Sequence, residues 1–335
     1  MNRFLLAGGL LLAPASLAFA ASCNFISGGA TINPGTITVQ RDVAVGESLS
    51  DYFFVSIVPA FRDCEFNSES PTWRAVGLLS ANTFSSGLSY QGHRVFDTNL
   101  PGVGMIIIGE ASIDTDLSNK SPLVGIYSGQ REVVFWTQDV IKGTLFQASA
   151  RVGIRLIKTG TISGGTLSGN IGRFFNRIRT QHVLPDVPIT FSGGSIRVVS
   201  CSVTTPNISV PLGKQAKSSF KGVGSGTEWQ SFDIQLNCIK GARINVRLDA
   251  TAAPATTRKD IMRLDPESGD IAAKGVGIQI GYRMGYELEL GKTLLYETSK
   301  FDTEFILLRA RYYQTEENVI AGKANGTATF TLTYK

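Results

Sequence analysis

The last residues of the chain alternate between apolar and polar side chains. Ala328, Phe330, Leu332 and Tyr334 are apolar or aromatic, and threonines occupy positions 327, 329, 331 and 333. A period of two predicts a strand with one face on a hydrophobic core. We expect this strand to run from Gly322 to Lys335, with no further residues to pair with its outer edge. It is either the closing strand of an ordinary sandwich or a strand whose free edge another chain completes.

The first twenty residues have the pattern of a secretory signal peptide. Arg3 precedes the apolar run Phe4 to Leu12, and Ala18-Phe19-Ala20 supplies small residues at the positions that precede a cleavage site. The apolar run is shorter than the roughly twenty residues that span a bilayer, and no later segment approaches that length. We therefore expect an exported mature chain that begins at Ala21.

Four cysteines in an exported chain predict two disulfide bonds. Three pairings are formally possible. Their order favours Cys23 with Cys64 and Cys201 with Cys238, because each pair then lies near the start of its own half. A zinc site is the competing interpretation, but the sequence has neither C-x-x-C spacing nor clustered histidines. We expect no metal and no cofactor.

Composition and an internal repeat predict two all-β domains. Glycine is abundant at 36 residues, only 18% of residues are charged, and short stretches rich in Val, Ile, Thr and Phe recur between turn residues. Gly102-Val103-Gly104 begins 38 residues after Cys64, and Gly275-Val276-Gly277 begins 37 residues after Cys238. We therefore predict two tandem immunoglobulin-like β-sandwiches, at residues 21–197 and 198–335.

The net charge of +5 is unevenly distributed. Residues 21–196 hold thirteen basic and thirteen acidic side chains, whereas residues 197–335 hold eighteen basic and fourteen acidic ones. A neutral first half argues against nucleic acid or another polyanion as its ligand. Neutral glycans and protein surfaces remain as ligand classes.

The second half resembles the pilin subunits of the chaperone–usher pathway. The resemblance rests on Gly322 fourteenth from the end, the Ala324-Asn325-Gly326 turn, the alternating strand, the penultimate Tyr334, and the segment Trp229 to Cys238 with its cysteine spacing. It implies an incomplete immunoglobulin-like sandwich with an open hydrophobic groove. In that family a periplasmic chaperone fills the groove first, and a neighbouring pilus subunit donates the final strand at the outer-membrane usher.

The resemblance also implies which residues would form the chaperone and donor-strand interface. They are Gly322, Ala328, Phe330, Leu332, Tyr334 and the C-terminal Lys335. After signal cleavage only Ala21 and Ser22 precede Cys23, too few to act as a donor strand. We therefore expect a subunit that accepts a strand and gives none, a layout that resembles two-domain fimbrial tip adhesins at the cell surface.

In tip adhesins the first domain binds a host receptor, usually a glycan. A structural cap without a receptor is the alternative. A secreted enzyme is a third class, but two histidines and the absence of a catalytic constellation in the sequence predict that the protein is not an enzyme.

Sugar recognition needs aromatic faces beside planar polar groups, and two sets of residues in the first half offer them. The first set is Trp73, Arg74, Tyr90, Gln91, His93, Arg94 and Asp97, and the second is Trp136, Gln138 and Asp139. The alternative for each tryptophan is a place in the core of the sandwich.

Overall fold

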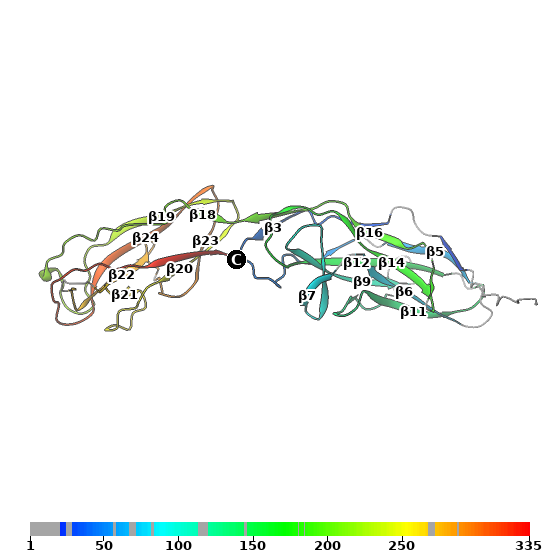
Figure 1. The fold of residues 1–335 in the computed structure, drawn as a ribbon, viewed down its shortest axis with the longest axis horizontal. Helices are drawn as coiled ribbons and strands as arrows, with labels where there is room; N and C mark the ends of the chain where they lie inside the picture. Colours follow the sequence, from blue (N-terminus) through cyan, green and yellow to red (C-terminus); the bar gives the residue numbers. More distant parts are fainter. Residues whose placement is uncertain are drawn as a thin grey trace, which may run out of the picture.

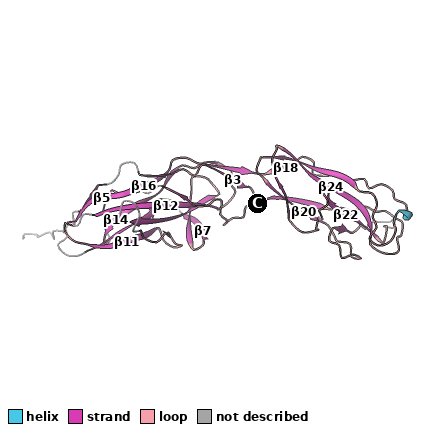
Figure 2. Cartoon of the chain, turned by 180° about the vertical axis from the view of Figure 1, so that it is seen from behind, coloured by secondary structure: helices cyan, strands magenta, loops and turns pink. Residues whose placement is uncertain are grey.

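A computed structural model shows two β-sandwiches placed end to end, with the C-terminus between them (Figure 1). The structure describes residues 21–24, 29–55, 58–66, 72–81, 84–112, 120–143, 146–179, 181–183, 185–266, 272–286 and 288–335. The predicted signal peptide, residues 1–20, lies outside them. Regular structure in the described part is β-strand, apart from one 3-10 turn, η1 (Lys217–Ser219), at the far end of the second sandwich (Figure 2). The all-β prediction is confirmed.

No helix in the described residues is long and apolar enough to cross a membrane.

The N-terminal sandwich contains strands β1 to β17. Their bounds are β1 (Ala21–Asn24), β2 (Ala30–Ile32), β3 (Thr36–Gln40), β4 (Phe53–Phe54), β5 (Val58–Phe66), β6 (Thr72–Ser80), β7 (Phe84–Tyr90), β8 (His93–Asp97), β9 (Val103–Ser112), β10 (Val124–Gly125), β11 (Glu132–Val140), β12 (Phe146–Lys158), β13 (Gly165–Thr166), β14 (Gly169–Ile178), β15 (Gln181–His182), β16 (Val187–Phe191) and β17 (Ser195–Val199).

Two sheets form the layers of this sandwich. One has the order β1-β5-β12-β9-β8-β7, and the other has the order β11-β6-β14-β16-β2. A small sheet, β13-β17-β3, lies toward the second sandwich (Figure 1). Every residue of β9, which lies between β12 and β8, is buried. Met105 and Ile107 belong to the main core, and Ile106 packs with Val95 and Ile157 in a smaller cluster on the other face of the sheet. The core of the N-terminal sandwich lies between its two sheets.

The C-terminal sandwich contains strands β18 to β25. Their bounds are β18 (Cys201–Val203), β19 (Gln230–Cys238), β20 (Arg243–Asp249), β21 (Ile261–Met262), β22 (Val276–Tyr282), β23 (Leu294–Thr298), β24 (Thr303–Gln314) and β25 (Thr329–Tyr334). The described strands form a sheet of order β18-β19-β24-β22-β21 and a facing sheet of order β23-β20-β25. A second core, separate from the first, lies between these two sheets.

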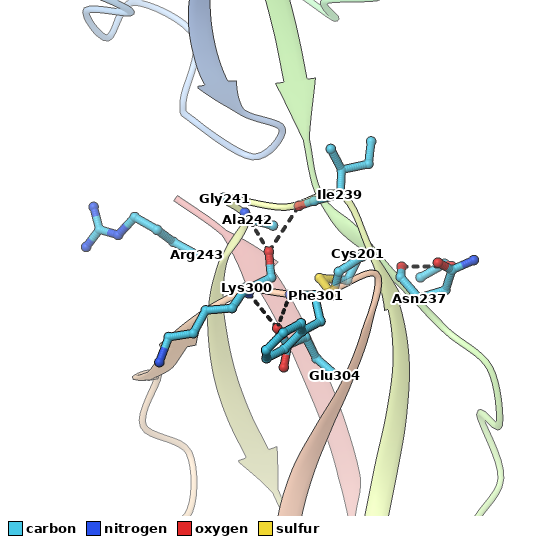
Figure 3. The surroundings of a disulfide bond; sticks show 12 residues. Cys201, Asn237, Ile239, Gly241, Ala242, Arg243, Lys300, Phe301 and Glu304 are labelled. Carbon is cyan, nitrogen blue, oxygen red and sulfur yellow. Dashed lines mark hydrogen bonds between the residues drawn. A yellow bond between two sulfur atoms is a disulfide. The ribbon is translucent and has the colours of Figure 1, made fainter.

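Both predicted disulfide bonds are confirmed. Cys23 is bonded to Cys64, which joins β1 to β5, and Cys201 is bonded to Cys238, which joins β18 to β19. Figure 3 shows the second bond at the end of the C-terminal sandwich that faces β3. There the Glu304 carboxylate accepts hydrogen bonds from the backbone N–H groups of Lys300 and Phe301, which fixes the neighbouring turn.

The C-terminal strand alternates as predicted but is shorter. In β25 the side chains of Phe330, Leu332 and Tyr334 face the second core, whereas Thr329 and Thr331 are exposed. A strand reaching back to Gly322 is wrong. The preceding residues bond to another loop instead of to β20: the Asp265 N–H donates to the Asn325 carbonyl, and the Thr327 hydroxyl donates to the Asp265 carboxylate.

The two sandwiches follow each other with a single residue, Ser200, between β17 and β18. Val198 packs against the first core, and Val199 belongs to the second. β17 also pairs in parallel with β3, so two strands of the N-terminal sandwich approach the junction together.

The repeated Gly-Val-Gly segments occupy equivalent places in the two sandwiches. Gly102 and Gly275 have φ of 77° and 76°, each directly before the buried central strands β9 and β22. A Cβ at Gly102 would overlap the Thr161 carbonyl oxygen, and one at Gly275 would overlap the Asn318 carbonyl oxygen. The same backbone conformation and the same close approach therefore require glycine in both halves.

We expect Gly275→Ala to lower the free energy of unfolding by about 3 kcal/mol, through the positive φ and the overlap with a carbonyl oxygen. Gly285→Ala is the matched control, because Gly285 has a φ of 95° with nothing within 4 Å of the added Cβ. It should cost only about 1 kcal/mol. Urea denaturation measures both. Equal losses in the two variants would contradict the close-approach argument.

Candidate functional site

An apolar groove runs along the C-terminal sandwich beside β25. Its cavity has a volume of about 420 Å³ and lies between the extended segment 206–212 and residues 326–330. The lining is Pro206, Asn207, Ile208, Ser209, Val210, Leu212, Phe232, Ile234, Leu248, Met262, Ile278, Ile280, Leu308, Ala310, Gly326, Thr327, Ala328 and Phe330. Most of these side chains are apolar, so the groove fits an apolar occupant.

The floor of the groove is the second hydrophobic core itself. Ile234, Ile280 and Leu308 come from β19, β22 and β24 of the larger sheet, and Leu248 comes from β20 of the facing sheet. The two sheets therefore do not close over their shared core at this side. In a complete sandwich another strand would cover these side chains.

In the described part of the chain, no strand pairs with either wall of the groove on the side that faces the groove. β25 is the last strand of its sheet and pairs only with β20. On the other wall, Ile208, Val210 and Leu212 are half-buried at alternate positions, as in a strand, but segment 206–212 joins no sheet. A β-strand lying in the groove would meet the open edge of β25 on one side and segment 206–212 on the other.

A second hollow of about 490 Å³ continues the groove at the end away from the N-terminal sandwich. Its walls continue the two walls of the groove along the chain, with residues 213–217 on one side and residues 319–325 on the other. Phe220, Val276 and Tyr312 supply apolar lining, whereas Lys214, Lys217 and Lys323 add exposed positive charge. Gly322 lies here in the loop wall, outside β25.

The candidate receptor residues of the N-terminal sandwich fall on two different sheets. Trp73 and Arg74 are on β6, and Trp136, Gln138 and Asp139 are on the neighbouring β11. Tyr90, Gln91, His93, Arg94 and Asp97 belong to the β7–β8 hairpin of the other sheet. The first predicted set is therefore not one surface. Figure 1 shows β7 nearer the junction and β11 nearer the far end.

Trp73 is the centre of the first group, which we call the Trp73 surface. Its side chain is 40% exposed, and Asp139 lies directly opposite it across the β6–β11 pair. The Arg177 guanidinium lies 5.8 Å from the Trp73 ring centroid and forms an ion pair with Glu132 at 2.5 Å. An exposed ring beside carboxylates and a guanidinium has the chemistry that sugar or protein recognition uses. Trp136 is half-buried.

Arg74 is wrong as a receptor residue, because alternation along β6 turns it inward. It is only 1% exposed, and its Nε donates to the Asn176 Oδ1 at 2.6 Å. Its Nη2 lies 3.2 Å from the Cys64 sulfur, and the Asn176 amide lies 3.1 Å from the Cys23 sulfur. Burial lowers the pKa of Arg74 to about 8. Arg74 and Asn176 together support the first disulfide.

The hairpin group gathers around Tyr127, and we call it the Tyr127 surface. Gln91 and Gly92 form the two-residue turn of the hairpin with positive φ, which places Tyr90 opposite His93. The His93 ring stacks on Tyr127 at 5.0 Å between centroids, and burial lowers the His93 pKa below its ordinary value. Tyr127 itself is 48% exposed.

Beside this stack, the Arg94 Nη1 donates to the Gln130 carbonyl at 2.7 Å, and an open hollow follows from Tyr127 to residue 134. Asp97 lies at the other end of β8, opposite Gly104.

The sequence analysis missed Tyr127 and Arg155. The Arg155 guanidinium lies 4.2 Å from the Tyr52 ring centroid, and its Nη1 is 3.4 Å from the Tyr90 hydroxyl. Each of these residues comes from a strand or loop distant in sequence from its partners. The sequence contains no local signal that could have joined them.

No group of three or more histidine, cysteine, aspartate or glutamate side chains suited to a metal ion occurs among the described residues.

Sequence comparison places the chain among known proteins. Residues 189–335 match the family of fimbrial proteins. A type-1 fimbrial protein subunit of Serratia marcescens is 31% identical over 155 residues, which are 42% of this chain and 83% of that protein. The chain belongs to the fimbrial protein family. The members of this family are structural components of pili at the cell surface, not enzymes, so the protein is an extracellular pilus component.

The likeness extends beyond the part that the family match covers. A fimbria adhesin protein of Klebsiella pneumoniae is 27% identical over 273 residues, 76% of each chain. That length exceeds either sandwich, so the alignment includes parts of both. Among solved structures, the CupB6 tip adhesin from Pseudomonas aeruginosa aligns with 94% of this chain and 93% of its own, at 18% identity and a TM-score of 0.38. The match to the Klebsiella protein confirms the predicted resemblance to fimbrial adhesins.

We expect Asn176→Ala to lower the free energy of unfolding by about 2 to 4 kcal/mol, because it removes an acceptor from the buried Arg74 guanidinium. Gln138→Ala is the control, since Gln138 is exposed on the same sheet. It should change stability by less than about 0.5 kcal/mol. Thermal unfolding of the oxidised protein measures both. An Asn176→Ala protein as stable as the control would contradict a structural role for this pair.

Proposed function

We propose that this protein is a fimbrial tip adhesin that is anchored to its pilus by accepting a β-strand from a neighbouring subunit. The observation that supports strand acceptance is the groove of the C-terminal sandwich, with the core as its floor and the open edge of β25 as one wall. In this proposal residues 198–335 are the pilin domain, and residues 21–197 are the receptor-binding domain.

The proposed occupant is an extended strand with alternating apolar side chains. Its backbone would pair with β25, and every second side chain would enter the groove over Ile234, Ile280 and Leu308. The same groove would hold a strand of the periplasmic chaperone before assembly at the usher. Because an open apolar groove and a free strand edge promote aggregation, one occupant or the other is needed throughout export.

The described N-terminal residues do not offer a donor strand of their own. β1 (Ala21–Asn24) pairs with β5, and Cys23 within it is bonded to Cys64. This segment is therefore used within its own sheet. Its place supports a subunit that receives a strand at the tip of the pilus.

The receptor is proposed to be a host glycan or protein. The Trp73 surface and the Tyr127 surface each combine an exposed aromatic ring with charged or amide groups, and the sequence of the first half is neutral overall. The Trp73 surface is on β6 and β11, which Figure 1 shows on the side of the junction away from the C-terminal sandwich, so a receptor could approach it without meeting the pilus. A structural cap without a receptor is the second candidate.

Strand acceptance is tested by adding a strand in cis. The mature full chain is extended beyond Lys335 with a flexible glycine-serine linker of about twelve residues and a designed strand of alternating Val and Thr. We expect the melting temperature to rise by about 10 °C and binding of a hydrophobic dye to fall, because the strand covers the floor of the groove. The control strand has proline at alternate positions, which removes backbone donors. Equal melting temperatures with the two strands would contradict strand acceptance.

Receptor binding is tested with the same cis-complemented chain on arrays of glycans and matrix proteins. We expect Trp73→Ala to weaken binding at least tenfold while the protein stays folded, because an exposed ring at a binding surface carries much of the affinity. Tyr127→Ala is the matched variant on the other surface and should leave binding unchanged. The reverse result would move the receptor site to the Tyr127 surface. Binding by neither parent nor variant to any ligand would favour the structural cap.

A further inference from the structure

The open edge of β25 has a definite end, and the N-terminal sandwich forms it. The backbone N–H of Asp42 donates to the Tyr334 carbonyl oxygen at 2.9 Å, and the Tyr334 N–H donates to the Asp42 Oδ2 at 3.0 Å. Asp42 lies in the turn that follows β3. Both backbone groups of Tyr334 are therefore bonded to a residue from the other sandwich.

The direction of these bonds places Asp42 on the free edge of the sheet. In an antiparallel pair, alternate residues exchange backbone hydrogen bonds with the partner strand, and the residues between them point theirs to the opposite edge. Tyr334 is aligned with Ile244 of β20 but bonds to Asp42, so Tyr334 belongs to the outward-pointing set. By the same alternation Leu332 and Phe330 also point outward. Asp42 occupies the place opposite Tyr334 that a residue of an added strand would take.

Contacts to both sandwiches hold this turn in position. Gln40 bonds to the C-terminal sandwich twice, because its Nε2 donates to the Gly241 carbonyl and its Oε1 accepts from the Arg243 N–H, each at 2.8 Å. In Figure 3 the turn after the blue β3 approaches Gly241. Within its own sandwich, the buried Lys158 donates to the Arg41 carbonyl at 2.7 Å.

Charge strengthens the contact. The Arg41 guanidinium lies 4.7 Å from the Tyr334 ring centroid and 2.9 Å from the Asp42 carboxylate. Burial alone would raise the pKa of Asp42, but the Arg41 side chain and the Tyr334 N–H hold this pKa below its ordinary value. Asp42 is therefore an ionised acceptor at neutral pH, which makes a stronger hydrogen bond than a neutral one.

We propose that Asp42 ends the strand-acceptor site, so that an added strand pairs with β25 at Phe330 and Leu332 and stops before Tyr334. The N-terminal sandwich then sets how far along β25 the incoming strand can reach. The occupant is the alternating apolar strand of the proposed function, on which this inference rests. A strand that continued to Tyr334 would have to displace the turn and break the Gln40 contacts with it.

The test compares two ways of attaching the same designed strand to the mature full chain. One uses the flexible linker described above, which lets the strand begin pairing at Leu332. The other joins the strand to Lys335 by a two-residue Asn-Gly turn, which forces its first pairs onto Tyr334. In the chain with its native turn, we expect the melting temperature with the tight connection to be about 5 °C lower than with the flexible linker. The reason is that the two hydrogen bonds between Asp42 and Tyr334 must be broken.

Two variants decide whether the turn causes this difference. In the double variant Gln40→Ala/Asp42→Ala, the difference in melting temperature between the two connections, which we call the gap, should disappear. In Asp42→Ala alone the gap should become smaller. Glu47→Ala is the matched control, because Glu47 is an exposed acidic residue of the same segment, and the gap should remain. Circular dichroism shows whether each variant is folded.

The outcomes separate this inference from the proposed function. If the flexible connection fails to raise the melting temperature above that of its proline control, strand acceptance itself is overturned. If both connections stabilise the native chain equally, or if the gap persists in Asp42→Ala and in the double variant, then Asp42 does not end the site and the inference is overturned. A gap that closes only in the variants of the turn supports it.

Discussion

The unpaired edge of β25 determines the rest of the C-terminal sandwich. A sheet edge with apolar side chains beneath it is stable in water only when something pairs with it or covers it. In this chain the buried core side chains Ile234, Ile280 and Leu308 line the floor of the groove beside that edge. The fold is therefore a sandwich with its sheets in place and a groove beside the edge strand, and this groove is the proposed strand-acceptor site.

The junction between the sandwiches is part of this arrangement. β17 continues to β18 through Ser200, and β3 runs beside β17, so the turn after β3 is delivered to the C-terminal end of β25. Because the end of β25 contacts this turn, the C-terminus lies in the middle of an elongated molecule (Figure 1). A residue almost three hundred positions earlier in the chain bonds to the penultimate residue, and the acceptor edge cannot be described from the C-terminal sandwich alone.

The sequence predicted what local periodicity determines. Alternation identified β25 and the face that Phe330, Leu332 and Tyr334 present to the core, and cysteine order gave both disulfides. The start of β25 could not be predicted, because Asp265, a residue of another loop, bonds to Asn325 and Thr327 and draws them away from β20.

The candidate receptor site was predicted less well. Trp73 and Arg74 are adjacent in sequence and point to opposite faces of β6, and a strand buried on most of both faces gives no sequence signal for which face is outer. Trp73 is exposed and stays a candidate receptor residue, whereas Arg74 is buried. The neighbours of Arg74 in space are Asn176 and the Cys23–Cys64 disulfide, and they come from three other strands.

The two ends of the groove differ in charge and in shape, which gives it a direction. Asp42 and its turn close one end with hydrogen bonds to Tyr334, whereas Lys214, Lys217 and Lys323 surround the hollow at the other end. A strand laid in the groove in one direction or the other would bring different termini and side chains to these ends. Electrostatic complementarity discriminates between such arrangements more than it adds to affinity. In the proposed function, the apolar floor would supply most of the binding energy, and the two unlike ends would supply the register and the direction.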